Sequence, residues 1–392
     1  MNIGIFTDTY YPQVSGVATS IKTLREQLES RGHNVYIFTT TDPKVDKNVF
    51  ERNIFRFTSV PFVSFTDRRI AVRGLFQAYE IAKELNLDIV HTQTEFSMGL
   101  IGKFVAKNLK IPCVHTYHTM YEDYLHYVMK GKVLRPAHVK QLSKTFCEHM
   151  TGIIAPSVRV LETLTSYGVK EPITVIPTGV DITKFSAVKS ENLREKYQIA
   201  PETPLLLTVS RVAFEKDIDR LINAFPEIQK RVPGVRLMIC GDGPAKAQLE
   251  EQVAAMELTD QVIFTGEIDH DEVPAYYQMA DLFVSTSISE SQGLTFIEAL
   301  AAGLKVVAAS GPYTDELLDD LNVGATFETP VQFVEQTVEY LLHPQKYADN
   351  VVREKKVASI SADNFGEAVL EFYQDCCAGA PAVDADQSRE RI

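Results

Sequence analysis

The sequence lacks a long apolar run: no stretch approaches the roughly 18–20 residues that a membrane-spanning helix requires. It also lacks the features of a secretory signal, because residues 1–6 lead into an apolar segment with no basic region before it. Cysteine is scarce, and its five copies show no metal-ligand spacing: Cys113, Cys147, Cys240, Cys376 and Cys377. We therefore expect reduced thiols in a cytoplasmic protein.

Signals for a metal site are weak. Asp-x-Asp triplets begin at Asp217, Asp269 and Asp384, but none directly follows an apolar stretch. Such triplets recur by chance in an acidic region. We expect no tightly bound cofactor, no required metal at the site (although a divalent ion could stimulate activity) and no nucleic-acid partner.

Charge is distributed unevenly along the chain. Within a net charge of −13, residues 1–180 hold 21 Lys and Arg against 16 Asp and Glu, whereas residues 181–392 hold 18 against 36. This asymmetry suggests that the basic half faces a polyanion or an anionic surface. Random drift of surface charge would produce the same pattern.

The remaining pattern predicts an α/β protein of two domains, for which 392 residues are sufficient. Apolar segments alternate with amphipathic segments of about 10–15 residues, as in a doubly wound parallel sheet. Strands are expected at 2–7, 35–39, 88–91, 113–116, 152–155, 173–176, 205–209, 235–240, 262–265, 282–286 and 305–308. Helices are expected at 17–30, 78–85, 98–109, 158–166, 218–229, 245–256 and 361–375.

A Pro- and Gly-containing break at residues 177–181 separates the two halves. We therefore expect domains at 1–177 and 178–360. The tail 378–392 shows no periodicity and is expected to be disordered. Two such sheets facing each other would bind ligands in a cleft at the carboxyl ends of their strands.

Two cations follow the expected strand at 205–209, namely Arg211 and Lys216. Arginine offers a forked donor to a phosphate and lysine a point charge, so together they could neutralise a diphosphate leaving group. A surface salt bridge of these cations with Glu215 or Asp217 is the structural alternative.

Two carboxylates, Glu290 and Glu298, flank an expected helix start near Gly293. Helix N-termini favour anions, and Glu298 in the first turns could accept hydrogen bonds from a polyhydroxylated ligand. A sugar nucleotide offers both a diphosphate and vicinal hydroxyls. Gly16, in the loop after the first strand, would also let backbone amides approach a phosphate, although that signal alone is weak.

With the segment 241–244 (Gly-Asp-Gly-Pro), these residues resemble the family 4 retaining glycosyltransferases of GT-B architecture, two Rossmann-like doubly wound parallel-sheet domains facing across a cleft. The resemblance extends to about residue 375 and implies a UDP-sugar-dependent, retaining hexosyltransferase. It also implies that the helix 361–375 crosses back onto the first domain. The site residues that it implies are Arg211 and Lys216 at the diphosphate, Glu298 at the ribose, Glu290 at the donor sugar, backbone of Gly293, Leu294 and Thr295 at sugar or phosphate, and Gly16 near the phosphate.

Three histidines lie at or just past expected strand ends in the first half. The resemblance assigns the loop residue His118 to the donor sugar and reaction centre. We expect His91 and His115 to lie in or near the core. Together with Arg211, Lys216 and Glu290, His118 completes the expected catalytic set.

Acceptor residues are sought in the basic half, where aromatic and cationic side chains interleave and no acid occurs between Asp123 and Glu148. This composition suits a surface lying on anionic lipid, or a helix packed on its own domain with a solvated basic face. The candidate acceptor or membrane residues are Tyr10, Gln13, Phe62, Phe65, Arg68, Arg69, Lys130, Lys132, Arg135 and Lys140.

These stretches, together with residues 6–17 and 91–97, resemble the bacterial diacylglycerol glucosyltransferases. The resemblance implies transfer of glucose from UDP-glucose to diacylglycerol, giving α-monoglucosyldiacylglycerol for glycolipids and lipoteichoic acid anchors, by a protein peripheral on the inner face of the cell membrane. Galactosyl transfer, addition of a second sugar to a glucosylated lipid, and a soluble acceptor stay open. A sugar-nucleotide binding module without turnover is the non-enzymatic alternative.

Overall fold

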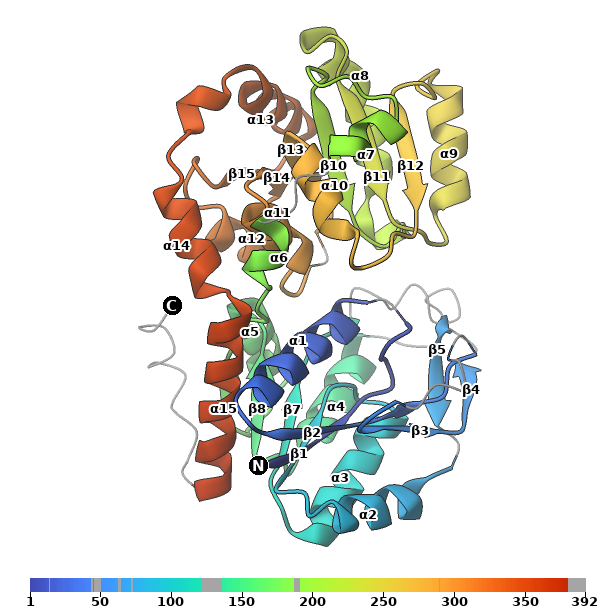
Figure 1. Cartoon of the computed structure of the whole chain (residues 1–392), viewed down its shortest axis with the longest axis vertical. Helices are drawn as coiled ribbons and strands as arrows, with labels where there is room; N and C mark the ends of the chain where they lie inside the picture. Colours follow the sequence, from blue (N-terminus) through green and yellow to red (C-terminus); the bar gives the residue numbers. More distant parts are fainter. Residues whose placement is uncertain are drawn as a thin grey trace. The chain divides into compact units, whose positions relative to one another are not determined.

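The computed structural model describes residues 1–13, 15–43, 45, 51–62, 65–71, 73–121, 136–186, 191–288 and 290–379. The chain forms two compact units (Figure 1). The N-terminal unit comprises residues 1–179 and the segment from Ala362 onward, and the C-terminal unit comprises Val180–Ser361. In the part of the chain that is described, no helix combines the length and apolar character needed to cross a bilayer.

The N-terminal unit is built on a parallel sheet with strand order β3-β2-β1-β6-β7-β8-β9. A separate antiparallel hairpin is formed by β4 and β5. Its strands are β1 (Asn2–Phe6), β2 (Asn34–Thr40), β3 (Ile54–Phe57), β4 (Ser59–Phe62), β5 (Phe65–Ala71), β6 (Ile89–Thr92), β7 (Cys113–Thr116), β8 (Gly152–Ala155) and β9 (Ile173–Val175). Its helices are α1 (Gly16–Ser30), α2 (Leu75–Glu84), α3 (Ser97–Leu109), α4 (Pro136–Cys147), α5 (Val158–Ser166) and α15 (Ala362–Ala378).

The C-terminal unit contains a second parallel sheet, with strand order β12-β11-β10-β13-β14-β15. Its strands are β10 (Leu205–Val209), β11 (Arg236–Cys240), β12 (Val262–Gly266), β13 (Leu282–Ser285), β14 (Lys305–Ala309) and β15 (Gly324–Phe327). Its helices are α6 (Ile182–Ser186), α7 (Glu191–Lys196), η3 (Phe214–Lys216), α8 (Ile218–Arg231), α9 (Lys246–Ala255), α10 (Val273–Met279), α11 (Leu294–Ala301), α12 (Pro312–Leu317), α13 (Pro330–Leu342), η4 (Pro344–Tyr347) and α14 (Val351–Ser359).

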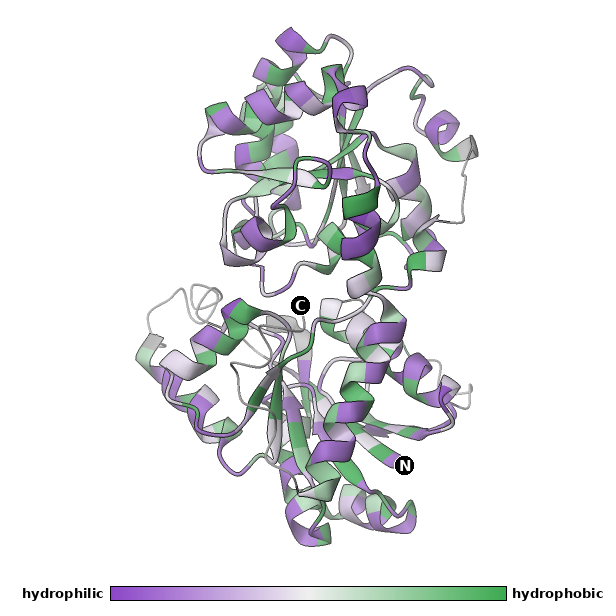
Figure 2. Cartoon of the chain, turned by 90° about the vertical axis from the view of Figure 1, so that its left-hand side faces the viewer, coloured by the Kyte–Doolittle hydropathy of each residue, from purple (hydrophilic) through white to green (hydrophobic). Residues whose placement is uncertain are grey.

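Each sheet is buried on both faces, which explains why its strands read as continuous apolar runs. Two hydrophobic clusters cover the two faces of the first sheet, and two others cover the second. The strands are mostly hydrophobic, whereas the helices around them mix both characters (Figure 2). In α1, Ile21, Leu24 and Leu28 form the buried stripe that their spacing predicts.

The last helix, α15, belongs to the N-terminal unit although it follows the C-terminal unit in sequence (Figure 1). It packs beside α1. Its residues Phe365, Val369, Phe372 and Tyr373 are buried in the hydrophobic cluster on the sheet face that carries Ile3 and Ile5 of β1. Ala378 still lies in this helix rather than in the expected tail, and residues 380–392 lie outside the described part.

Most of the expected elements are confirmed, and the strands 113–116, 152–155 and 205–209 have the bounds that the pattern predicts. The sequence pattern missed the β4–β5 hairpin and several C-terminal elements, among them β15, α13 and α14. The hairpin contains Pro61 and a register shift, which obscure strict alternation. The short β15 contains Gly324, where an added Cβ would lie 2.1 Å from the Val306 carbonyl oxygen, so the close backbone packing at this position favours glycine, a residue that is unusual in strands.

Candidate active site

The order of the strands places one candidate site in the C-terminal unit. Strands β11 and β12 lie on one side of β10, whereas the next strand in sequence, β13, pairs with the other side of β10. Parallel sheets bind ligands at such a switch point, beyond the carboxyl ends of the strands. Arg211 and Lys216 follow β10, and Glu290 follows β13, so the structure brings these sequence-predicted residues to the same edge.

Lys216 forms an ion pair with Glu290. The two charged atoms lie 2.6 Å apart, and the side chains are only 14% and 17% exposed. The partner of the Lys216 ammonium in this ion pair is Glu290, rather than Glu215 or Asp217, which the sequence offered as alternatives. Limited exposure reduces solvent screening, so this pair carries more electrostatic weight than a surface one.

A side chain in the loop after β13 contacts the cation loop, the segment 210–217 that carries Arg211 and Lys216. The Thr286 hydroxyl donates to the carbonyl oxygen of Asp217 at 2.8 Å and lies 3.3 Å from that of Lys216. The backbone that carries Lys216 is thereby joined to the loop that carries Glu290. Lys216 is held in position by this connection and by its ion pair, while Arg211 is exposed.

Two glycines let the loop after β11 pack directly on the backbone around Arg211. A Cβ at Gly241 would lie 2.0 Å from the Ser210 carbonyl oxygen, and one at Gly243 would lie 2.3 Å from that of Val212. The Val212 amide also donates to the carbonyl oxygen of Asp242 at 2.9 Å. The Gly-Asp-Gly-Pro segment therefore supports the cation loop.

The carboxylate pair flanks the start of α11, as its sequence predicts. Gly293 lies just before the helix with φ +64°, a conformation that favours glycine. Leu294 and Thr295 open the helix, so their amides lie among the N-terminal groups that have no partner within a helix. This end of α11 therefore favours an anion.

Glu298 lies on the buried face of α11 and is 8% exposed. The Tyr277 hydroxyl of α10 donates to its Oε2 atom at 2.7 Å. Burial raises the pKa of Glu298 to about 7, and the hydrogen bond from Tyr277 opposes that rise. Its charge therefore changes near neutral pH and responds to any ligand that donates to it.

A second candidate site lies at the switch point of the N-terminal sheet, where β1 pairs with β2 on one side and β6 on the other. Asp8, buried beyond β1, accepts hydrogen bonds from the Thr94 hydroxyl (2.7 Å), the Ser97 hydroxyl and the Met98 amide (3.1 Å). This carboxylate holds the loop after β1 against the start of α3. Gly16 opens α1, exposed, beyond that loop.

His118 lies in the loop after β7, and its Nε2 atom lies 2.6 Å from Oε1 of Gln93. Burial, with His115 second, lowers the pKa of His118 to about 3. His91 and His115 are fully buried, as expected, and burial lowers the pKa of His91 far below its usual value. His118 is therefore a neutral ring at physiological pH.

The expected acceptor residues do not form one described surface. Tyr10 is 7% exposed and belongs to the same hydrophobic cluster as Ile3 and Ile5, and its expected contact with an acceptor stays a prediction. Gln13 is half-buried in that loop.

The basic candidates differ in their surroundings. The Arg69 guanidinium donates to Ser59 across the hairpin, at 2.9 Å to the hydroxyl and 2.8 Å to the carbonyl oxygen. Exposed Lys140 donates to the carbonyl oxygen of Ser166 at 2.9 Å. The side chains of Phe62, Phe65 and Arg68, and residues Lys130, Lys132 and Arg135, lie outside the described part.

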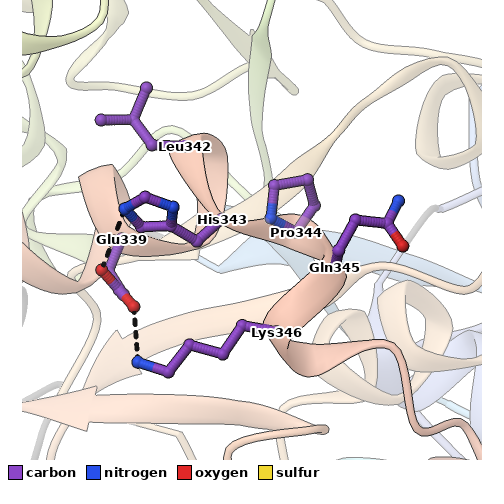
Figure 3. A pocket seen from close by; sticks show the side chains of 6 residues that line it. All are labelled: Glu339, Leu342, His343, Pro344, Gln345 and Lys346. Carbon is purple, nitrogen blue, oxygen red and sulfur yellow. Dashed lines mark hydrogen bonds and ion pairs between the residues drawn. The ribbon is translucent and has the colours of Figure 1, made fainter.

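A hollow lies at the end of α13 (Figure 3). It is lined by consecutive turns of one segment: Glu339, Leu342, His343, Pro344, Gln345 and Lys346. Lys346 forms an ion pair with Glu339 at 2.8 Å, and these side chains are 63% and 35% exposed. We place the candidate chemistry at the switch points, because the hollow gathers no groups from different strand ends. Over the described ranges, no group of three or more His, Cys, Asp or Glu is arranged to hold a metal ion.

Sequence reasoning missed Asp8, Gln93 and Tyr277. Asp8 and Gln93 directly follow strand regions, and polar residues there could have been flagged. Tyr277 gave no such signal, because it lies in a helix, 21 residues before its partner Glu298.

Comparison with known proteins connects this geometry to a family. Residues 189–357 match the model of "Glycosyl transferases group 1", and residues 14–184 match that of "Glycosyltransferase Family 4". An α-monoglucosyldiacylglycerol synthase of Streptococcus pneumoniae is 47% identical over 380 residues, which cover 96% of this chain and 86% of the relative. One from Acholeplasma laidlawii is 35% identical, with 96% of each chain covered.

Solved structures share the fold at low identity. The Anabaena protein HepE in complex with UDP superposes with a TM-score of 0.76 at 19% identity, over 96% of this chain and 100% of that one. Sucrose-phosphate synthase from Thermosynechococcus elongatus gives 0.77 at 21% identity, over 97% and 100%. With two Rossmann-like units, the expected cations at a switch point and these matches, the chain belongs to the GT-B glycosyltransferases of family 4.

Proposed function

We propose that this protein transfers glucose from UDP-glucose to diacylglycerol with retention of configuration, producing α-monoglucosyldiacylglycerol. The observation that carries the choice of acceptor is the 47% and 35% identity, over 96% of the chain, to two relatives named α-monoglucosyldiacylglycerol synthase. The charged groups at the switch point of the C-terminal sheet supply the chemistry that such a donor needs.

The C-terminal unit would bind the donor. Arg211 and Lys216 would neutralise the diphosphate, and the first amides of α11 would add donors to it. Glu298 would accept hydrogen bonds from the ribose hydroxyls. Glu290, paired with Lys216, would contact the donor sugar.

The reaction would use the leaving diphosphate as its own base. The acceptor hydroxyl attacks the anomeric carbon on the face from which UDP departs, and its proton passes to a phosphate oxygen of UDP. Charge therefore develops on the diphosphate, where Lys216 and Arg211 act. His118 would contribute as a neutral hydrogen-bonding ring near the donor sugar, because its low pKa excludes the doubly protonated, charged form at pH 7.

The substrate assignment is tested with radiolabelled donors and defined acceptors. We expect UDP-glucose and diacylglycerol in mixed micelles to give an α-linked monoglucosyl lipid, identified by chromatography and by the anomeric coupling in the NMR spectrum. Parallel reactions use UDP-galactose, monoglucosyldiacylglycerol and a soluble glycoside. Labelled product from a soluble acceptor alone, or from another donor alone, would reject this assignment.

We also propose that the N-terminal unit binds anionic membrane surfaces peripherally. Residues 1–180 hold 21 Lys and Arg against 16 Asp and Glu, although the segment 362–392 of the same unit adds seven acidic residues against two basic ones. Each Lys or Arg that lies near an anionic lipid surface favours binding by about 1 kcal/mol. Large apolar side chains are exposed on this unit, with Phe76 at 74%, Leu142 at 63% and Leu100 at 57%. Aromatic and aliphatic side chains beside cations are typical of interfacial binding.

Vesicle sedimentation tests this surface. We expect binding to vesicles with anionic lipid at low salt, weaker binding at high salt, and little binding to zwitterionic vesicles. Phe76→Ser should weaken binding about tenfold, since a buried Phe contributes about 1.5–3 kcal/mol and insertion would be partial. Val331→Ser, at a 66% exposed apolar residue of the C-terminal unit, is the matched control. Equal binding by both variants and the parent would count against a membrane contact through Phe76.

A further inference from the structure

A buried chain of hydrogen bonds connects the last helix of the protein to His118. The Tyr373 hydroxyl of α15 lies 2.6 Å from Nδ1 of His91. Nε2 of His91 lies 3.0 Å from the amide nitrogen of Gln93, whose Oε1 lies 2.6 Å from Nε2 of His118. Tyr373 and His91 are fully buried and Gln93 is 2% exposed, so the three residues that lead to His118 are shielded from water.

The chemistry of the Gln93 amide gives this chain a direction. An amide oxygen only accepts, so Nε2 of His118 carries a proton and donates to Oε1 of Gln93. The amide nitrogen only donates, so it donates to Nε2 of His91, which carries no proton. A neutral His91 then holds its proton on Nδ1 and donates it to the Tyr373 oxygen.

A further contact agrees with this direction. The Thr116 hydroxyl lies 2.7 Å from Nε2 of His91, the nitrogen that the Gln93 amide also approaches. A hydroxyl can donate or accept, so the Thr116 hydroxyl can donate to this nitrogen when the nitrogen carries no proton. Burial also lowers the pKa of His91, which keeps its ring neutral and limits it to a single ring proton.

We propose that Tyr373 is a positioning residue that, through His91 and Gln93, fixes the ring orientation of His118 and holds its proton on Nε2. The importance of this tautomer for transfer rests on the proposed function of His118 at the donor sugar; the chain of hydrogen bonds itself does not. Tyr373, His91 and Gln93 act through His118 and are not proposed to touch the substrate.

Loss of the Tyr373 oxygen has a defined consequence along the chain. In Tyr373→Phe, the Nδ1 proton of His91 would lose the oxygen that accepts it, so Nδ1 would no longer be the favoured position of the ring proton. The proton would move to Nε2 of His91, and the Gln93 amide would turn to present its oxygen to it. Its NH₂ group would then face His118, whose proton would shift to Nδ1.

Long-range ¹H–¹⁵N spectra of the whole protein labelled with [¹⁵N]histidine test this sequence of events, since each tautomer has a distinct pattern. The signal of His118 among the nine histidines is assigned with a His118→Gln variant. We expect the Nε2–H tautomer in the parent and the Nδ1–H tautomer in Tyr373→Phe. Gln93→Met, which removes both links, should also release His118 from the Nε2–H form. Tyr340→Phe is the matched control, because the Tyr340 hydroxyl is buried in the C-terminal unit and donates only locally, to the Leu321 carbonyl oxygen at 2.8 Å.

Kinetics form a separate arm. In Tyr373→Phe we expect kcat to fall about tenfold or more, with KM for UDP-glucose unchanged, because orientation rather than donor binding is affected. A proton on Nδ1 of His118 in the parent, or an unchanged tautomer in both variants, would overturn the proposal. Absence of glucosyl transfer by the parent would reject the proposed function, while the spectra would still decide the role of Tyr373.

Discussion

Replacing Lys216 with alanine is expected to lower kcat for glucosyl transfer about 10²–10³-fold, equivalent to about 2.7–4 kcal/mol of barrier. The diphosphate gains charge as it leaves, and Lys216 is a largely buried cation held at the strand edge by Glu290 and the Thr286 contact. Its loss would also leave the Glu290 carboxylate without this counter-charge. Arg211→Ala should act in the same direction with a smaller effect, because Arg211 is exposed.

Initial rates at saturating UDP-glucose and acceptor measure this effect. Lys230→Ala is the control, since Lys230 also forms an ion pair, with Glu227 at 2.8 Å, but those side chains are 72% and 54% exposed on α8. Its turnover should match that of the parent. Turnover near the parental value in both Lys216→Ala and Arg211→Ala would contradict the proposed stabilisation of the leaving group.

Glu298→Ala is expected to weaken UDP binding about 10–100-fold. Hydrogen bonds from ribose hydroxyls to a charged acceptor are worth about 1.5–3 kcal/mol, and each 1.4 kcal/mol is tenfold in Kd. The substitution also leaves the buried Tyr277 hydroxyl without the partner that it has in the native protein. Calorimetric titration with UDP measures the loss.

The same carboxylate predicts a pH dependence. Because burial raises the pKa of Glu298 to about 7, the ionised acceptor becomes more populated as pH rises from 6 to 8, and UDP should bind more tightly. Glu298→Gln should lose this contribution, while the titration of UDP itself is common to both proteins. Tyr277→Phe removes a hydrogen bond that lowers this pKa, so its dependence should move to higher pH. Identical pH profiles for the parent and Glu298→Gln would refute the assignment.

The raised pKa of Glu298 affects folding stability in the opposite direction from UDP binding: stability decreases as pH rises. Between the ordinary glutamate value of 4.5 and about 7, the unfolded residue releases its proton before the native one does. The unfolded state therefore binds fewer protons, and the contribution of Glu298 to stability decreases as pH rises through this window. Ribose hydroxyls that donate to the carboxylate would offset part of that cost, which links donor binding to the stability of the C-terminal unit.

The positions of the two cations after β10 could be predicted from the sequence, but the partner of Lys216 could not. Arg211 and Lys216 lie two and seven residues after the apolar strand 205–209, and cations in the loop after a strand can be recognised from the sequence alone. The pairing of Lys216 with Glu290 joins residues 74 apart in sequence. It depends on β13 lying beside β10, which local pattern does not specify.

The basic half shows what composition leaves undetermined. Tyr10 reads as an aromatic residue of a polar loop, yet it packs in the core of the N-terminal unit. Arg69 reads as part of a cationic surface, yet it donates to Ser59 across a hairpin. Charge and aromaticity describe what a side chain can do, whereas its direction depends on the register and turn geometry of the backbone.

The sequence by itself determined two alternating α/β halves, the strand-end cations, the carboxylates around α11 and the buried nature of His91 and His115, because apolar periodicity and residue order are local properties. Tertiary structure alone decided which groups meet: Lys216 with Glu290, Tyr277 with Glu298, and Tyr373 with His91 across 282 residues. Such meetings follow from strand order and helix packing, in which many weak contacts across the whole unit act together. The pKa of Glu298 is likewise a tertiary property, because it reflects burial that no stretch of sequence specifies alone.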